Sequence, residues 1–236
     1  MPDIDDFVAG FSILLKPDGV ATFEFPHLLN LIESNQFDTI YHEHYSYLSL
    51  TAVEQIFAAN GMKVFDVEEY PTHGGSLRVF AQRHETGWHA RNASVDLLLR
   101  REAEIGMTSA DYYQGFQAKT NKVKDDFLGF LLDAKRQGKR VCAYGAAAKG
   151  NTLMNYAGIR PDLISYVVDR NPAKQGKYMP GSRIPIVDEI HLKGDAPHFV
   201  LILPWNIKEE VMRQLEYIRA WGGRFVTAVP KLKIES

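Results

Sequence analysis

The chain has 236 residues, 45% hydrophobic and 24% charged, which is an ordinary composition for a soluble globular protein of one or two domains. Its formal net charge of −2 gives no bulk attraction to nucleic acid or membrane, and the single cysteine, Cys142, excludes an intrachain disulfide and a four-cysteine zinc site. The single cysteine indicates a reducing compartment, no apolar run approaches ~18–20 residues, and the acidic start has no signal-peptide character. With the near-neutral net charge, we therefore expect a cytoplasmic protein with neither nucleic-acid nor membrane partners.

The first residues predict a helix, a turn and a strand. Apolar side chains recur at helical spacing from Phe7 to Leu15, residues 16–19 (KPDG) predict a turn, and residues 20–25 are rich in strand-forming side chains. A single αβ unit cannot bury both of its faces. We therefore expect this one to be the last part of a larger sheet, with the rest missing upstream.

Residues 51–93 predict a small α+β segment. Thr51 is a suitable N-cap for a helix over residues 52–60, with Glu54 at the capping-box position. Two strands follow, joined by a PTHGG turn, either as a hairpin or as two neighbouring strands. Their expected bounds are residues 62–70 and 76–82.

Residues 94–138 predict a long helical connection, interrupted at residues 106–109, where Thr108 or Ser109 would cap the second part. From residue 139 onward strand and helix alternate, which is typical of a Rossmann-like parallel sheet flanked by helices. The expected strands are residues 140–144, 163–169, 198–203 and 224–228, and the expected helices are residues 146–156 and 208–221. The fold class is therefore α/β.

The densest chemistry lies in residues 41–47 (YHEHYSY). Histidine titrates close to neutral pH, a glutamate can orient it, and tyrosine hydroxyls can donate to an oxyanion. The set is suited to removing a proton beside a carbonyl and stabilising the enolate. If the segment is extended, alternate side chains share a face. One face would then hold Tyr41, Glu43, Tyr45 and Tyr47, and the other His42 and His44.

Two other interpretations of this motif stay open. Aromatic residues at a domain junction can pack together without taking part in any chemistry. A His-x-His pair on a strand can also hold a metal ion, with a third ligand from His73, His84, Glu43 or an aspartate.

Residues 144–152 (YGAAAKGNT) follow a predicted strand and open a predicted helix. Small residues let a phosphate approach the backbone, the helix N-terminus offers free N–H groups, and Lys149 adds a positive charge. Asp169 follows Gly145 by 169 − 145 = 24 residues, near the position where dinucleotide folds place a ribose-binding acid. The glycine spacing matches neither the dinucleotide fingerprint nor a P-loop. Tight helix–sheet packing with a turn aspartate is the alternative.

Residues 73–76 (HGGS) form a second glycine-rich turn. Paired glycines give either a flexible turn or a place where a ligand lies close to the backbone. Arg78, on the strand that follows, can pair with a phosphate or a carboxylate.

Four motifs together resemble the C-terminal region of SAM-dependent nucleotide-sugar C-methyltransferases of deoxysugar biosynthesis. They are residues 35–49 (NQFDTIYHEHYSYLS), 73–78 (HGGSLR), 144–152 (YGAAAKGNT) and 168–177 (VDRNPAKQGK), in the family's order. The resemblance implies a transferase that uses S-adenosyl-L-methionine (SAM), a substrate such as a dTDP-4-keto-deoxysugar, and no metal in this chain. It also implies that a histidine of the first motif deprotonates C3 beside the 4-keto group, so that the carbanion attacks the methyl group.

Carried over by position, the resemblance makes His44 the base, with Tyr41, Glu43 and His42 as the other catalytic candidates. The expected substrate-binding residues are Tyr45, His73, Gly74, Gly75, Ser76, Arg78, Gly145, Ala146, Lys149, Gly150, Asn151, Thr152 and Asp169. The expected domain organisation is a SAM-type remnant with the catalytic motif (1–50), a small α+β segment (51–93), a helical connection (94–138) and a Rossmann-like nucleotide-sugar-binding domain (139–236).

The chain departs from the family in lacking its cysteine-rich zinc segment and the glycine-rich first strand-loop of a SAM fold. We therefore expect a fragment, a truncated gene product or half of a split enzyme, inactive until a SAM-binding domain or partner chain is supplied. Two rival hypotheses remain. One is a nucleotide-sugar-binding module without catalysis, and the other is a nicotinamide-dependent oxidoreductase, which the missing dinucleotide spacing disfavours.

Overall fold

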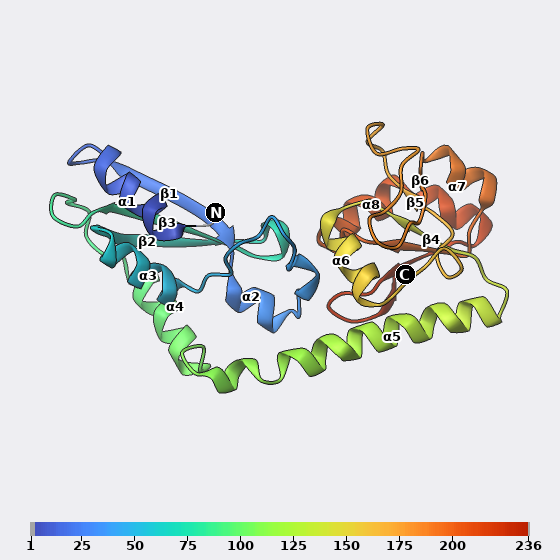
Figure 1. The fold of residues 1–236 in the computed structure, drawn as a ribbon, viewed down its shortest axis with the longest axis horizontal. Coiled ribbons are helices and arrows are strands. Elements are labelled where there is room, and N and C mark those ends of the chain that lie inside the picture. The colour runs from blue at the N-terminus through green and yellow to red at the C-terminus, as the bar shows by residue number, and fades with distance from the viewer. Residues whose placement is uncertain (1–2, 236) are drawn as a thin grey trace. The chain divides into compact units, whose positions relative to one another are not determined.

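A computed structural model describes residues 3–235, apart from the side chain of His73. The chain folds into two compact units (Figure 1). The first unit combines Met1–Ser34 with His42–Phe116, and the second combines Asn35–Tyr41 with Gln117–Ser236. In the described part of the chain, no helix has both the length and the apolar character needed to cross a membrane.

A three-stranded sheet with the order β1-β3-β2 organises the first unit. Its strands are β1 (Val20–Pro26), β2 (Met62–Tyr70) and β3 (Ser76–Arg83), and β3 runs antiparallel to both neighbours. The expected strands 62–70 and 76–82 therefore form a hairpin, closed by the short 3-10 turn η2 (Thr72–Gly74). The register pairs Pro26 with Ser76, so the end of β1 lies beside the glycine turn.

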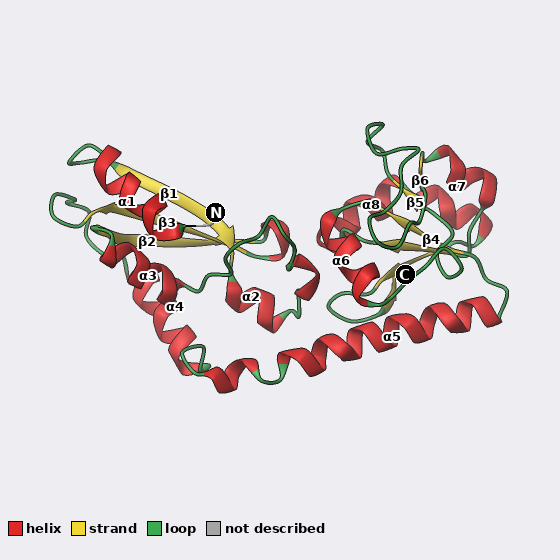
Figure 2. Ribbon diagram, in the orientation of Figure 1, coloured by secondary structure: helices red, strands yellow, loops and turns green. Residues whose placement is uncertain are grey.

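The helices of the first unit bury its apolar core against this sheet (Figure 2). Phe23 of β1 is partly buried and packs against this core, with its ring edge-on to Phe11 at 4.7 Å and to Phe57 at 5.1 Å between centroids. Such aromatic pairs contribute about 0.5–1.5 kcal/mol beyond the burial of their area. The helices are α1 (Ile4–Leu14), α2 (Leu28–Glu33), α3 (Leu50–Ala59), α4 (Ala93–Glu104) and the 3-10 turn η3 (Ala110–Tyr113).

The N-cap predicted for α3 is wrong. The helix begins at Leu50, and its cap is Ser49, whose side-chain oxygen accepts a hydrogen bond from the N–H of Ala52 at 3.1 Å. Thr51 lies inside the first turn, and its hydroxyl donates at 2.7 Å to Glu102 of α4. The local sequence pattern assigns the Thr51 hydroxyl to capping, but in the structure it donates to Glu102, which is distant in the sequence.

The second unit contains a six-stranded sheet with the order β6-β5-β4-β7-β8-β9. Its pairs are parallel except that the last strand runs antiparallel to β8, so the expected parallel sheet with flanking helices is present. The strands are β4 (Val141–Tyr144), β5 (Val167–Val168), β6 (Ile186–Val187), β7 (Phe199–Ile202), β8 (Arg224–Thr227) and β9 (Lys233–Glu235).

Helices flank this second sheet. The longest, α5 (Phe116–Arg136), buries the stripe that includes Phe127 and Leu131, and its Phe130 ring lies edge-on to Phe199 of β7 at 5.0 Å. The others are α6 (Ala148–Tyr156), α7 (Ile190–Asp195) and α8 (Lys208–Gln214), with the 3-10 turns η1 (Phe37–Thr39), η4 (Trp205–Ile207) and η5 (Glu216–Trp221). The turn η1 packs on α6, which is why Asn35–Tyr41 belongs to this unit.

Several expected elements are shorter than their sequence pattern. The strand predicted over residues 163–169 is confined to Val167–Val168, and the helix predicted over 208–221 breaks into α8 and η5. The helix expected from residue 146 begins at Ala148, because Gly145 adopts a left-handed φ of +90° and the N–H of Ala146 is bound by Asp169. The elements α2, α7, β6 and β9 were not predicted.

Candidate functional site

The Tyr-His-Glu-His segment borders a pocket of about 340 Å³ in the first unit. Glu43 and His44 line it together with Tyr45, Ser46 and Tyr47, and the chain there forms a turn and an irregular loop. The segment is not extended, so the alternation that an extended chain would give does not apply, and five consecutive residues line one pocket. The rest of the lining is mainly apolar and comes from Ile4, Phe7, Val8, Phe23, Glu24, Phe25, Pro26, Leu48, Val53, Ile56 and Phe57.

The two histidines of the motif have different surroundings. His44 is half-buried in the pocket wall, with its ring edge-on to Tyr47 at 6.4 Å between centroids. His42 has a side chain that is 86% exposed, and its Nε2 lies 3.9 Å from a carboxylate oxygen of Glu43. Tyr45 is also largely exposed, and Tyr41 belongs to the second unit. The structure thus brings His44, Glu43 and Tyr47 to one pocket and leaves His42 off its lining.

In the glycine-rich turn of residues 73–76, backbone conformation and close packing account for the glycines. Gly75 has a φ of +118°, and a Cβ there would lie 2.4 Å from the side-chain nitrogen of Asn30. Its carbonyl accepts a hydrogen bond from the N–H of His27 at 3.1 Å. Gly74 is also left-handed, and Ser76 is buried with its hydroxyl turned to Thr72. The side chain of His73 lies outside the described part of the structure.

Arg78 is engaged by neighbours on the same sheet. Its guanidinium donates to Glu24 at 2.8 Å and to the Tyr70 hydroxyl at 3.0 Å, and it lies over the Tyr70 ring. The hydrogen bond from Arg78 lowers the pKa of Glu24. Arg78 therefore neutralises a carboxylate at the edge of the pocket.

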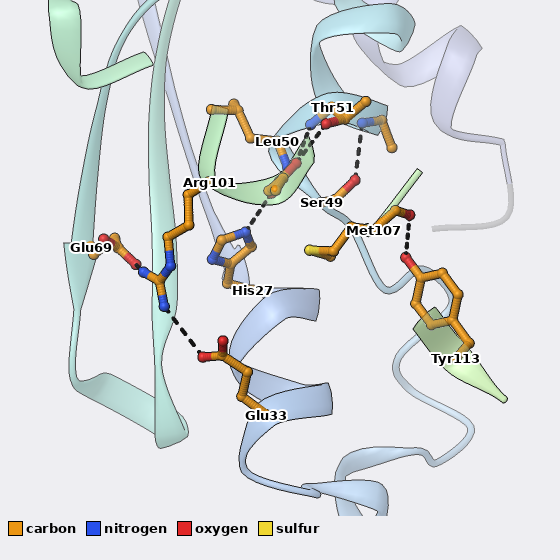
Figure 3. Close-up of polar contacts among 11 residues, drawn as sticks. His27, Glu33, Ser49, Leu50, Thr51, Glu69, Arg101, Met107 and Tyr113 are labelled. Carbon is orange, nitrogen blue, oxygen red and sulfur yellow. Dashed lines mark hydrogen bonds and ion pairs between the residues drawn. The ribbon is translucent and has the colours of Figure 1, made fainter. Parts of the chain in front are cut away.

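A buried polar network that joins α4 to the start of α3 and to His27 was missed by sequence reasoning. Glu102 of α4 is completely buried and accepts hydrogen bonds from His27, Leu50 and Thr51. Figure 3 shows the His27 ring turned toward the start of α3, where Leu50 and Thr51 lie. One signal was available. Val95, Leu98 and Glu102 are the buried positions of α4, so a charged residue occupies the apolar stripe.

The carboxylate of Glu102 is held in its charged form. Burial raises its pKa, but the hydrogen bonds from His27, from the hydroxyl and N–H of Thr51 and from the N–H of Leu50 outweigh this, so the pKa is lowered. The Nδ1 of His27 has no hydrogen-bond partner in the part of the structure that is described, which leaves Nε2 as the ring's donor to the carboxylate.

In the second unit, the glycine-rich loop packs closely on the turn after β7. A Cβ on Gly145 would lie 2.6 Å from Pro204, and one on Gly150 would lie 2.6 Å from Leu203. Both glycines therefore permit tight packing of α6 against the sheet. Thr152 bonds back to its own helix at Ala148.

Asp169 lies beside this loop but is already hydrogen-bonded. One oxygen accepts from the N–H of Ala146 at 2.8 Å and the other from the N–H of Asn171 at 2.8 Å. Lys174 donates to the Ala146 carbonyl at 2.8 Å and lies 3.3 Å from Asp169. The carboxylate therefore braces the loop from within.

Lys149 belongs to a second polar cluster that sequence reasoning missed in part. Its ammonium donates to Asn206 at 2.7 Å and lies 4.7 Å from the centre of the Trp205 ring. The indole N–H of Trp205 donates at 2.7 Å to the buried carboxylate of Asp38. Burial raises the pKa of Asp38 to about 6, and burial also lowers the pKa of Lys149. Asp38 lies within the motif of residues 35–49, but the motif does not single out its carboxylate, and no motif contains Trp205; each gains its role from a distant partner.

Two acceptors near this cluster are left over. The Oδ1 of Asp38 and the side-chain oxygen of Asn151 are buried and have no hydrogen-bond partner within residues 3–235.

For the metal alternative, no group of three or more His, Cys, Asp or Glu side chains among those described is placed to hold an ion.

Comparisons with known proteins bear on both units. Residues 71–230 match the family described as the C-methyltransferase C-terminal domain. Over its 236 residues the chain is 35% identical to the C-methyltransferase NovU of Streptomyces niveus. It spans 56% of the length of that relative, which therefore has a large part that this chain does not cover.

Proposed function

The chain belongs to the C-methyltransferase family, and from this premise we propose that it is the substrate-activating portion of a C-methyltransferase. The substrate is a 4-keto nucleotide-sugar such as a dTDP-4-keto-deoxysugar, methylated at C3. The observation that carries the proposal is the placement of His44 in the wall of a largely apolar pocket beside Glu43 and Tyr47.

His44 acts as the general base in this proposal. It takes the proton from C3, the electron pair of the C3–H bond forms the C3–C4 double bond, and the electrons of the C4 carbonyl move to its oxygen. The Tyr47 hydroxyl donates to that oxygen, and Glu43 supports the imidazolium. The apolar lining from α1, β1 and α3 limits access of water to the carbanion.

The family implies SAM, which would supply an electrophilic methyl group. The described residues do not fit a site for it. Strand β1 runs through Pro26 into α2 without a glycine-rich turn, and the nearby carboxylate of Glu24 is already paired with Arg78. We therefore assign donor binding to the portion of the enzyme that this chain does not contain, supplied by a longer polypeptide or a partner chain.

The second unit is proposed to bind the nucleotide diphosphate. The first turn of α6 offers backbone N–H groups, and Lys149 adds a cation. Because the N–H of Ala146 already donates to Asp169, the diphosphate is placed at residues 148–152 and not at the loop before them. Binding of the nucleotide-sugar without catalysis is the second candidate, favoured by the lack of a fitting donor site.

Proton exchange separates these candidates without the methyl donor. The chain is incubated in D₂O with a dTDP-4-keto-6-deoxysugar, and loss of the C3 proton signal is followed by NMR. The wild-type chain should catalyse exchange, and His44→Asn should slow it by at least about 100-fold, the usual contribution of a general base. His84→Asn, on an exposed histidine away from the pocket lining, is the matched control.

The outcomes are distinct. Exchange that persists in His44→Asn, or that is lost instead in His42→Asn, removes the assigned role from His44. Calorimetric binding of the dTDP-sugar without C3 exchange favours the binding module. Binding of neither the dTDP-sugar nor SAM, with no exchange, contradicts both candidates.

A further inference from the structure

A single buried carboxylate joins the segments that border the His44 pocket. One oxygen of Glu102 accepts from His27 Nε2 at 2.8 Å and from the N–H of Leu50 at 2.7 Å. The other accepts from the N–H of Thr51 at 2.8 Å and from its hydroxyl at 2.7 Å. The four donors come from two segments that are apart in the sequence, the end of β1 and the start of α3.

Both segments continue into the pocket wall. His27 directly follows Pro26, and Leu50 comes two positions after Leu48 (50 − 48); Pro26 and Leu48 line the pocket. The backbone reinforces this connection, because the N–H of Leu28 donates to the carbonyl of Leu48 at 3.0 Å. Glu102 therefore holds both ends of the wall that carries His44.

Capping of α3 accounts for only part of this arrangement. Ser49 accepts from the N–H of Ala52 at 3.1 Å, and Glu102 takes the N–H groups of Leu50 and Thr51, but Glu102 also binds His27, which lies outside α3. An apolar residue at position 102 would continue the stripe of Val95 and Leu98 and would leave these buried donors without an acceptor. A buried charge is costly unless it is fully hydrogen-bonded, and such bonds are directional. The carboxylate fixes the position of the Leu48–Thr51 backbone in a way that an apolar contact does not.

We propose that Glu102 is a positioning residue for His44, acting through Thr51 and His27. The expected loss of C3 exchange rests on the proposed function, whereas the expected displacement of the His44 side chain does not. Displacement of the Leu48–Thr51 backbone would tilt the loop of residues 43–47 and move the imidazole away from the substrate carbon.

The test uses two routes to weaken the network in the full chain. Glu102→Gln replaces one acceptor oxygen by an amide donor that faces N–H groups. Thr51→Val removes only the hydroxyl donor, and Thr51→Ser restores it. Arg101→Gln is the matched control, because Arg101 is next to Glu102 on α4 but forms surface ion pairs with Glu33 and Glu69 (Figure 3).

The first readout is the side-chain NMR signal of His44 in histidine-labelled protein, assigned with His44→Asn. We expect it to shift in Glu102→Gln and Thr51→Val, and to return to the wild-type position in Thr51→Ser. Arg101→Gln should leave it in place. An unshifted signal in both network variants overturns the proposal whether or not the chain is active, and Thr51→Val carries the test alone if Glu102→Gln does not fold.

The second readout is C3 exchange, corrected for the folded fraction by circular dichroism. In the network variants we expect kcat to fall at least tenfold while KM for the dTDP-sugar changes less than twofold. Equal rates in wild type and both network variants would overturn the positioning role. A wild-type chain with no exchange would count against the proposed function alone, since the His44 signal still decides the positioning role.

Discussion

Replacement of Asp38 by Asn should make the second unit less sensitive to rising pH. Asp38 is fully buried, and burial raises its pKa from 3.8 to about 6 despite the hydrogen bond from Trp205 and the nearby charge of Lys149. The folded state therefore holds this proton more tightly than the unfolded chain does. The stabilisation is present in full below about pH 3.8 and is lost as pH rises through about 6.

The magnitude follows from the shift. A difference of 6 − 3.8, or about 2 pKa units, corresponds to about 3 kcal/mol at 1.36 kcal/mol per unit. About half of this is lost between pH 5 and pH 8, since part of the titration is complete at pH 5. Asn can still accept from the Trp205 indole and does not ionise. The stability of Asp38→Asn relative to wild type should therefore rise by about 1–2 kcal/mol over that interval.

Urea denaturation followed by tryptophan fluorescence at pH 5, 6, 7 and 8 measures this difference. Asp125→Asn is the matched control for the loss of a carboxylate, because the Asp125 side chain is 68% exposed. If the free energies of unfolding of Asp38→Asn and wild type run parallel from pH 5 to pH 8, Asp38 does not titrate in the folded protein as described.

Three further outcomes are expected. Gly75→Ala should destabilise the first unit by about 1–3 kcal/mol or more, because it combines a φ of +118° with a Cβ 2.4 Å from Asn30; Gly138→Ala, with a φ of +68° and open space, should cost less, and equal losses in urea melts would refute the clash. Phe127→Ala should cost about 3–5 kcal/mol in the same assay, since Phe127 is fully buried on α5, and a loss below about 1 kcal/mol would show that α5 is not packed there. The lowered pKa of Glu102 contributes stability that is present above about pH 4.5 and is lost as pH falls through its folded-state value. In thermal melts at a series of pH values, Glu102→Gln should lose less melting temperature on acidification than wild type does. An equal loss in both proteins would show that Glu102 is not ionised in the folded state.

Much of the architecture could be predicted from the sequence because it depends on short-range periodicity. The strand at residues 62–70 has the predicted bounds, and the alternation after residue 139 predicts the parallel sheet that is present. The glycine turn between β2 and β3 was also visible, since paired glycines permit the left-handed backbone found at Gly74 and Gly75. The motif of residues 41–47 identified the segment that borders the pocket.

The environment of each side chain was decided by distant parts of the chain. The sequence pattern does not distinguish the two histidines of residues 41–47. His44 lines the pocket and His42 is exposed because the segment forms a loop instead of an extended strand. Thr51 matches a capping pattern, yet its hydroxyl goes to Glu102, 51 positions away.

Periodicity and turn chemistry act over a few residues and therefore predict elements and motifs from the sequence alone. Burial and hydrogen-bond partners depend on which segments meet in space. Only the tertiary structure revealed that Asp38 is buried against Trp205 and that Glu102 links the two ends of the pocket wall, because in each case the partner lies dozens of residues away.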